Sequence, residues 1–219
     1  MFERSQVIIR KFQPVDREAV RKISQDTALM GESAALFFQG PEVMSDALSL
    51  YFTDYEPGSC FVAQVDTEVV GYIMGAVNKI TAEEVFNRKI ALPLLFKALA
   101  RGVFLKIKNL VFVYSCLLDL LKNGIKTPNF SKEYPATFHI NIRNGFRGQN
   151  IGAQLVSAYL GYLKTRGVTG VHLATMSDQA ANFFFLQGFK QLYQGKRSYF
   201  RHVLHRDVPL YIFGKLLKN

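Results

Sequence analysis

The amino-acid sequence predicts a mixed α/β fold. Segments with strand-like and helix-like patterns alternate along most of the chain, and an early pair of strands is joined as a hairpin. Alternation of this kind favours a central sheet flanked by helices, and the hairpin makes the strand directions mixed. The length of 219 residues fits one domain, or one domain with a subdomain. Apolar residues make up 49% and charged residues 20%, the balance of an ordinary globular core.

The first third of the chain predicts two helices between a first strand and the hairpin. Proline at a helix start and alternating apolar residues in strands are the signals used. The expected elements are a strand (7–11), a helix opened by Pro14 with Asp16 as its N-cap, a second helix (41–52), and the hairpin strands 60–65 and 69–77.

Residues 80–136 interrupt the alternation and predict a helical insertion subdomain within a single domain spanning 1–219. Residues 89–108 have a helical pattern with basic residues near one face. Residues 109–118 contain no charged side chain, and a helix that is apolar all round is buried or touches lipid. Asn123 and Gly124 end this helix, and a polar loop leads to Pro135.

After Pro135 strands and helices alternate again. Apolar residues between Ile151 and Leu163 form a helical stripe, and Gly167 is the expected C-terminal stop. The remaining expected elements are strands 137–142 and 170–175, a short helix 177–187, and two final strands, 189–193 and 209–215.

The net charge of +10 is unevenly distributed. Residues 1–84 carry a net charge of −6, residues 85–125 carry +6, and residues 126–219 carry +10. No helix-turn-helix spacing, RNA-binding aromatic motif or zinc finger accompanies the basic part, so we expect no nucleic-acid partner. A small polyanionic cofactor explains a local basic surface equally well.

Cysteine and histidine usage argues against a metal site. Two cysteines, Cys60 and Cys116, and four scattered histidines form neither an HExxH nor a CxxC motif. The N-terminal residues have no apolar core of signal-peptide length, and no run of 18 uncharged apolar residues occurs. These features predict a cytoplasmic protein with reduced thiols.

The stretch between the strand 137–142 and the following helix predicts an anion-binding turn. It contains Arg147, Gly148, Gln149, Asn150, Ile151, Gly152 and Ala153. Backbone N–H groups at a helix start have no helical partner, and the helix dipole adds positive charge, which suits a pyrophosphate. The alternative is a plain strand-to-helix turn. The pattern is neither a P-loop nor GxGxxG.

Residues 147–152 resemble the acetyl-CoA signature Gln/Arg-x-x-Gly-x-Gly/Ala of the GNAT (general N-acetyltransferase) superfamily. Residues 177–189 resemble that family's second signature, with matches at Ala180, Phe183, Gly188 and Phe189. The spacing between the signatures and the order of elements also agree outside 80–136. The resemblance implies a GNAT-like, largely antiparallel sheet flanked by helices, with a helical insertion between the third and fourth strands.

The resemblance further implies acetyl-CoA, or another acyl-CoA, as cofactor and transfer of its acyl group to a primary amine by direct attack in a ternary complex. It places the oxyanion donor on the backbone of residues 140–142, with Ile140 and Ile142 as the candidates. Three positions depart from the family pattern. Asn150 replaces the usual first glycine, Ser177 replaces an asparagine that contacts the cofactor, and Phe184 replaces the tyrosine acid.

His139 is a candidate general base, because it lies on the predicted strand 137–142 and has an ordinary pKa near neutrality. A half-buried structural histidine is the alternative, and His172 on the next strand poses the same choice. Tyr193 is a candidate acid in place of the missing tyrosine. The two cysteines are expected to be core thiols rather than acyl carriers.

The acceptor is expected to be a small-molecule or peptide amine. The acidic early segment, which includes Glu32, Glu42, Asp46, Asp54 and Glu56, suits a cationic amine, or is simply a solvated face. Three interpretations of residues 80–136 stay open: a lid over the acceptor site, a homodimer interface, or a surface lying on an anionic membrane. The last would turn a set of basic side chains toward headgroups: Lys89, Lys97, Arg101, Lys106 and Lys108. A non-catalytic CoA-binding or docking module is the rival to an enzyme.

Overall fold

The computed structural model describes residues 6–124 and 126–217. Its seven strands form one sheet in the order β1-β2-β3-β4-β5-β7-β6. The strands are β1 (Val7–Lys11), β2 (Cys60–Val65), β3 (Glu68–Ala76), β4 (Ala136–Ile142), β5 (Gly170–Thr175), β6 (Lys190–Arg197) and β7 (Val208–Leu216). All seven predicted strands are therefore present, and β6 extends four residues beyond its expected end.

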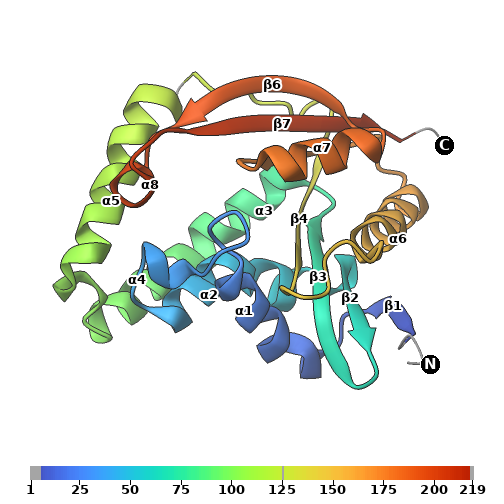
Figure 1. Cartoon of the computed structure of the whole chain (residues 1–219), viewed down its shortest axis with the longest axis horizontal. Helices are drawn as coiled ribbons and strands as arrows, with labels where there is room; N and C mark the ends of the chain where they lie inside the picture. Colours follow the sequence, from blue (N-terminus) through green and yellow to red (C-terminus); the bar gives the residue numbers. More distant parts are fainter. Residues whose placement is uncertain (1–5, 125, 218–219) are drawn as a thin grey trace.

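Helices cover both faces of this sheet. The helices are α1 (Arg17–Asp26), α2 (Pro41–Leu50), α3 (Lys79–Val85), α4 (Ala91–Ala100), α5 (Ile107–Asp119), α6 (Ile151–Thr165), α7 (Asp178–Leu186) and α8 (Arg201–Leu204). Figure 1 shows α1 and α6 on opposite sides of strands β2–β4. The short helix α8 was not expected from the sequence.

The pairing of β4 with β5 differs from every other pairing in the sheet. It is the parallel pair, and it is limited to Ala136 with Val171 and Thr137 with His172. The other neighbouring strands pair antiparallel over at least five positions. Past the two joined positions β4 and β5 separate, and in Figure 1 β6 and β7 run across the top while β3 and β4 descend below them. The predicted largely antiparallel α/β fold is confirmed.

Alternation along each strand supplies the two cores that hold these layers together. On β3, Ile73 joins the large cluster beneath α6 and α7, whereas Tyr72 and Met74 join the cluster beneath α1. Tyr159 of α6 is fully buried, and its hydroxyl donates to the carbonyl of Thr137 at 2.9 Å. A buried hydroxyl without a partner would cost free energy, so this bond fixes α6 against β4.

Three helices, α3 to α5, lie between β3 and β4, where the sequence predicts an insertion. The prediction of a single helix over residues 89–108 is wrong, because the helical conformation ends with α4 at Ala100 and resumes with α5 at Ile107. Gly102 has a left-handed backbone, with φ of +61°, and a 3-10 turn precedes α5. Glycine adopts this conformation without the steric cost that a Cβ imposes.

Polar contacts attach the insertion to the rest of the chain. Lys97 of α4 pairs with Asp46 of α2 at 2.6 Å, and Arg101 pairs with Glu42 at 2.8 Å. The fully buried Asn109 accepts from the Gln39 N–H at 2.6 Å and donates to two carbonyls. Lys97 and Arg101 are therefore engaged with carboxylates, and these two do not form part of the free basic surface that the membrane interpretation of residues 80–136 uses.

The Asp16 carboxylate does not cap α1 as expected. Asp16 occupies the N-cap position, but its side chain makes no capping bond to that helix. It accepts from the Gln13 N–H at 2.8 Å and from both terminal nitrogens of Arg10. Burial opposes ionisation of this carboxyl, yet the bonds from Arg10 and Gln13 hold its pKa below the ordinary value. The buried ion pair replaces the helix cap.

Gly75 is expected to be intolerant of a side chain, because a Cβ there would overlap the buried Tyr159 ring. Gly75→Ala should lower the free energy of unfolding by roughly 1–3 kcal/mol, the range for overpacked cores. Denaturant unfolding followed by circular dichroism measures this loss. The matched control is Gly161→Ala in α6, where a Cβ meets open space and alanine should stabilise the helix by about 1 kcal/mol. Equal stabilities of the two variants would contradict this packing.

Candidate functional site

Two helices begin where β4 and β5 separate. β4 leads through residues 143–150 to α6, and β5 leads through Met176 and Ser177 to α7. Parallel strands leave a crevice at their carboxyl ends, where ligands bind in open α/β sheets. The anion-binding turn predicted from the sequence therefore lies at the open end of the β4–β5 gap.

The backbone of this turn suits a close approach by a ligand. Gly148 has φ of +78°, and a Cβ there would meet nothing within 4 Å. Asn150, the N-cap of α6, has a left-handed backbone with φ of +63°, a conformation that asparagine tolerates better than most residues. Its side chain makes no capping bond. The N–H groups of the first helical residues, Ile151 to Ala153, have no acceptor within the helix.

Gly152 has a packing role in addition to its predicted place in the cofactor turn. A Cβ there would lie 3.2 Å from the Phe183 ring and 3.4 Å from Ile142. Gly152 is buried, so its missing side chain lets α6 pack against β4 and α7. A large residue at this position would disturb that packing whether or not a ligand binds.

Backbone donors on β4 face the gap between the strands. The Arg143 N–H bonds to the Val70 carbonyl of β3, and alternate residues of a strand point their backbone groups to opposite neighbours. Ile140 and Ile142 therefore direct their N–H groups away from β3. The Arg147 Nε donates to the Ile142 carbonyl at 3.1 Å, which folds the arginine back across the end of the strand.

Two of the remaining predicted cofactor residues, Ser177 and Phe184, lie at α7, and Gln149 lies in the turn before α6. The Ser177 hydroxyl caps this helix by accepting from the Ala180 N–H at 3.3 Å. Phe184 is buried in the core and makes edge-on contacts with Phe138 and Phe189. Gln149 lies in the exposed turn, where its amide donates to the Gly145 carbonyl.

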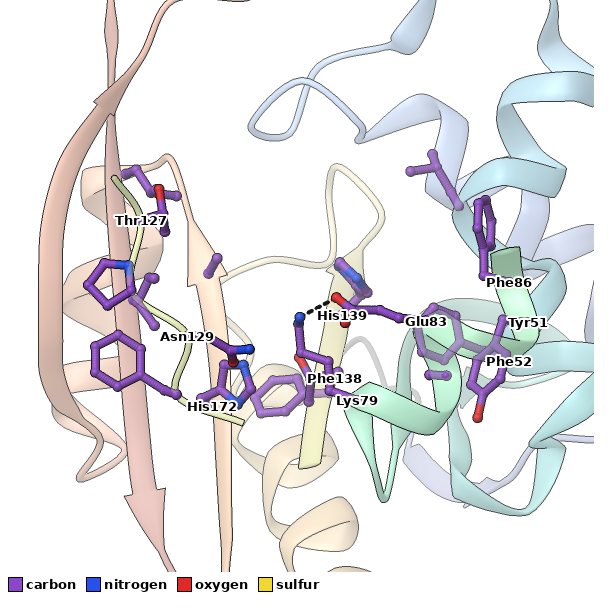
Figure 2. Close-up of a pocket in the computed structure, with 18 of the residues that line it drawn as sticks. Tyr51, Phe52, Lys79, Glu83, Phe86, Thr127, Asn129, Phe138, His139 and His172 are labelled. Atoms are coloured by element: carbon purple, nitrogen blue, oxygen red, sulfur yellow. Dashed lines mark hydrogen bonds and ion pairs between the residues drawn. The ribbon is translucent and has the colours of Figure 1, made fainter. Parts of the chain in front are cut away.

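A cavity of about 550 Å³ lies on the face of the sheet opposite α6 and α7. Its sheet side consists of residues on β4, β5 and β7 with Arg197 of β6. Its cover comes from α2, α3, the π-helical turns that follow these two helices, and the loop 127–130. Figure 2 shows Thr127, Asn129 and His172 across the cavity from Phe52 and Phe86, with His139 between them. Residues of the insertion thus form part of the wall, as they would in the lid interpretation of residues 80–136.

His139 is the accessible histidine of this cavity. Its side chain is exposed at the wall, 5.6 Å from the Phe52 ring between centroids. The surrounding protein desolvates the ring and lowers its pKa below the ordinary value. His172 also lines the cavity but is only 7% exposed, and its Nδ1 donates to the Tyr134 carbonyl at 2.6 Å. Burial lowers the pKa of His172 as well.

Tyr193 lies one strand further out. It pairs with Ile212 of β7, which places the two side chains on the same face of the sheet. Ile212 lines the cavity and Tyr193 does not. The proposed acid role of Tyr193 stays a prediction.

The ionised groups of the cavity are largely paired with one another. Glu83 forms an ion pair with Lys79, and Arg197 pairs with the buried Asp119 at 3.4 Å. The acidic residues that the sequence offered for an acceptor site do not line this cavity. Asp46 and Glu42 bind basic side chains of α4, Asp54 binds Arg17, and Glu56 accepts from the Tyr51 hydroxyl.

The two cysteines are placed as core thiols. Cys60 is buried, and burial raises its pKa to about 12. Cys116 is half-buried, and burial raises its pKa to about 11. Both are protonated at neutral pH, the form that is a poor nucleophile. Within residues 6–124 and 126–217, no group of three or more His, Cys, Asp or Glu side chains is arranged to hold a metal ion.

Comparison with known proteins identifies the architecture. No family model and no curated protein matches the chain. The crystal structure of SsHAT is similar over 98% of this chain and 100% of its own, with a TM-score of 0.74 and 24% identity. A polyamine N-acetyltransferase from Drosophila melanogaster that forms N-acetylagmatine is similar over 97% of this chain and 100% of its own, with a TM-score of 0.63 and 14% identity.

A third structure, yncA from Salmonella typhimurium with its cofactor acetyl-CoA, is similar over 97% of this chain and 95% of its own, with a TM-score of 0.59 and 14% identity. The chain has the GNAT fold. The resemblance inferred from residues 147–152 and 177–189 is confirmed at the level of the fold. Among the described residues, no helix of this GNAT fold combines the length and apolar character needed to cross a bilayer.

The lowered pKa of His139 predicts a pH-dependent stability. In the unfolded chain the His139 ring takes up a proton near pH 6.5. In the folded chain the same ring takes up the proton only at lower pH. Stability is therefore lost as the pH falls below 6.5. An NMR titration of ring protons should give His139 a pKa below 6.5. His139→Gln should lose less stability than the wild type between pH 7 and 5, and identical losses would contradict the assignment.

Proposed function

We propose that the protein is an acyl-CoA-dependent N-acyltransferase that transfers an acetyl group from acetyl-CoA to a primary amine. The observation that carries the proposal is the junction of two sites at the β4–β5 separation. The turn that leads into α6, for which the sequence predicts anion binding, lies at the carboxyl ends of the strands, and a cavity with an accessible histidine lies on one face of the same strands. A two-substrate transfer requires two such adjoining sites.

The residues present at the turn fit a CoA pyrophosphate. The first-turn N–H groups of α6 and the open backbone at Gly148 offer donors without a side chain in the way. Arg147, Gln149 and Asn150 border these donors, and Ser177 starts the facing helix. Ile140 and Ile142 offer backbone N–H groups that would donate to the oxygen of the thioester.

The proposed reaction needs no nucleophile from the protein. Bound acetyl-CoA supplies the acyl group: the amine nitrogen bonds to the thioester carbon, the carbon–sulfur bond breaks, and the electron pair leaves on sulfur. His139 accepts the proton lost by the amine, because its lowered pKa keeps the ring neutral at physiological pH. The protonated thiols of Cys60 and Cys116 take no part. His172 supports the wall through its bond to Tyr134.

The chemistry of the cavity favours an acceptor with an apolar body. Aromatic rings of Tyr51, Phe52, Phe86 and Phe130 line it. Glu83 is the one carboxylate among the described residues that line the cavity, and it is already paired with Lys79. A polyamine would bring additional ammonium groups into a site without an unpaired carboxylate to receive them, and burying an unpaired charge is costly. The proposed acceptor is therefore a monoamine with an aromatic or aliphatic body.

Gln149→Glu tests the cofactor site without changing the size of the side chain. A carboxylate in the exposed turn should repel the pyrophosphate and weaken acetyl-CoA binding about tenfold, the effect of roughly 1.4 kcal/mol. Isothermal titration measures the dissociation constant. The matched control is Gln194→Glu on the exposed edge strand β6, which should bind acetyl-CoA like the wild type. Equal weakening by both variants, or none by either, would place the cofactor elsewhere.

The acceptor preference is expected to favour monoamines over polyamines. With acetyl-CoA fixed, thiol release should give phenethylamine a kcat/KM at least tenfold above that of spermidine, because spermidine carries extra charges into the cavity. Agmatine, which carries two positive charges, serves as a second comparison. A preference for spermidine would contradict the proposed acceptor class. Acetyl-CoA binding without thiol release from any amine would favour the non-catalytic CoA-binding module.

A further inference from the structure

The outward side of α5 is an apolar face that no part of residues 6–124 and 126–217 covers. We define the α5 face as Ile107, Leu110, Val111, Tyr114 and Leu117 of α5 together with Leu121 of the π-helical turn that follows it. All six are exposed, with Ile107 at 78%, Tyr114 at 62% and Leu121 at 67%. Scattered exposed apolar residues are ordinary on a protein surface, but a continuous set of this kind marks an interaction site.

The inner side of α5, opposite the α5 face, is packed against the rest of the protein. Asn109 and Asp119 are buried, and Phe112 packs against Phe37 and Phe200 with ring centroids 4.7 and 6.1 Å away. The α5 face recurs every three or four residues on the opposite side, from Ile107 to Leu121. Figure 1 places α5 at one edge of the molecule, distant from β1 and both chain ends.

Lysines flank the α5 face, and its own segment, residues 85–125, contributes no exposed negative charge. Lys106 and Lys108 lie at the start of the helix and Lys122 just after its end, and all three are exposed. Asp119 is the one acidic residue between positions 85 and 125. It is buried, pairs with Arg197 and accepts from the Ser198 N–H at 2.6 Å.

The preceding helix, α4, also exposes apolar side chains next to a basic residue. α4 exposes four large apolar side chains: Leu92, Leu95, Phe96 and Leu99. Arg88 precedes them and is exposed. The basic side chains that tie α4 to α2, Lys97 and Arg101, lie on its other side.

We propose that the α5 face docks on an anionic membrane surface, with the helix lying in the interface. Exposed aliphatic and aromatic side chains flanked by lysines, with no exposed acid, match what an anionic bilayer offers: hydrocarbon below a layer of negative headgroups. This inference rests on α5 and is independent of the proposed acyl transfer.

A second copy of the chain is a poorer occupant. The spacing of the α5 face would also suit a helix pair. Such a pair would place Lys106, Lys108 and Lys122 of one copy beside the same residues of the other, and the face carries no exposed carboxylate to balance them. Charge complementarity therefore favours the membrane.

Vesicle flotation of the full chain tests the docking. Vesicles of phosphatidylcholine with 30% phosphatidylglycerol should carry the protein upward at 0.1 M salt, whereas pure phosphatidylcholine vesicles should not. Raising the salt to 0.5 M should reduce the bound fraction, because it screens the lysines. Failure of the wild type to float with the anionic vesicles would overturn the proposal.

Matched variants separate the α5 face from net charge. Leu117→Glu and Leu121→Glu should each lower vesicle affinity at least tenfold. Leu186→Glu at the end of α7 alters an equally exposed leucine by the same charge and should bind like the wild type. Circular dichroism and acetyl-CoA titration confirm that each variant is folded. Equal loss in all three variants would overturn the proposal, as would a dimer that Leu117→Glu converts to monomer while vesicle binding is unchanged.

Discussion

β4 and β5 are held together at one end and separated at the other, and both candidate sites depend on that geometry. The joined end is fixed from three directions. His172 of β5 donates to the Tyr134 carbonyl just before β4. Gly170 of β5 lies so close to the backbone of Glu133 and Tyr134 that a Cβ would not fit. The Tyr159 hydroxyl of α6 donates to the Thr137 carbonyl of β4. β5 is then paired along its full length with β7. β4 and β5 do not pair beyond Thr137 and His172, so the backbone donors of β4 past that point face a gap.

The two faces of the sheet carry different features where β4 and β5 separate. On one face α6 and α7 close the core, and their first turns lie at the open end of the gap, where an anion is favoured. On the other face the cavity is covered by α2, α3 and residues 127–130. The strong positive charge of the chain does not collect in that cavity. Acidic residues of the first half pair with basic side chains of α1 and α4. The cavity keeps several aromatic rings in its wall, and its carboxylate Glu83 is paired with Lys79.

Local signals in the sequence were enough for the strands, the turn and the fold. Period-two alternation located β1 to β5, and the known tolerance of asparagine for left-handed backbone explained Asn150, which does adopt it. The same reasoning could not predict contacts between residues that lie far apart in the sequence. Lys97 and Asp46 are 51 residues apart, and nothing near either residue indicates that they pair. The cavity wall likewise joins α3 to a loop more than 40 residues later. The break at Gly102 was missed because the apolar pattern continues through it.

The insertion connects the apolar outer surface to the cavity through a short chain of contacts. Asn109 joins α5 to the segment before α2, and Lys97 joins α4 to Asp46, which immediately precedes the cavity residue Ala47. α2 is therefore held by the same helices that carry the α5 face. An amine with an aromatic or aliphatic body concentrates at the interface of a bilayer, because its ammonium stays at the headgroups while its apolar body is buried. Docking through α5 would hold an aromatic cavity beside the surface where such an acceptor gathers, so the composition of the cavity and that of the outer helix favour the same class of substrate.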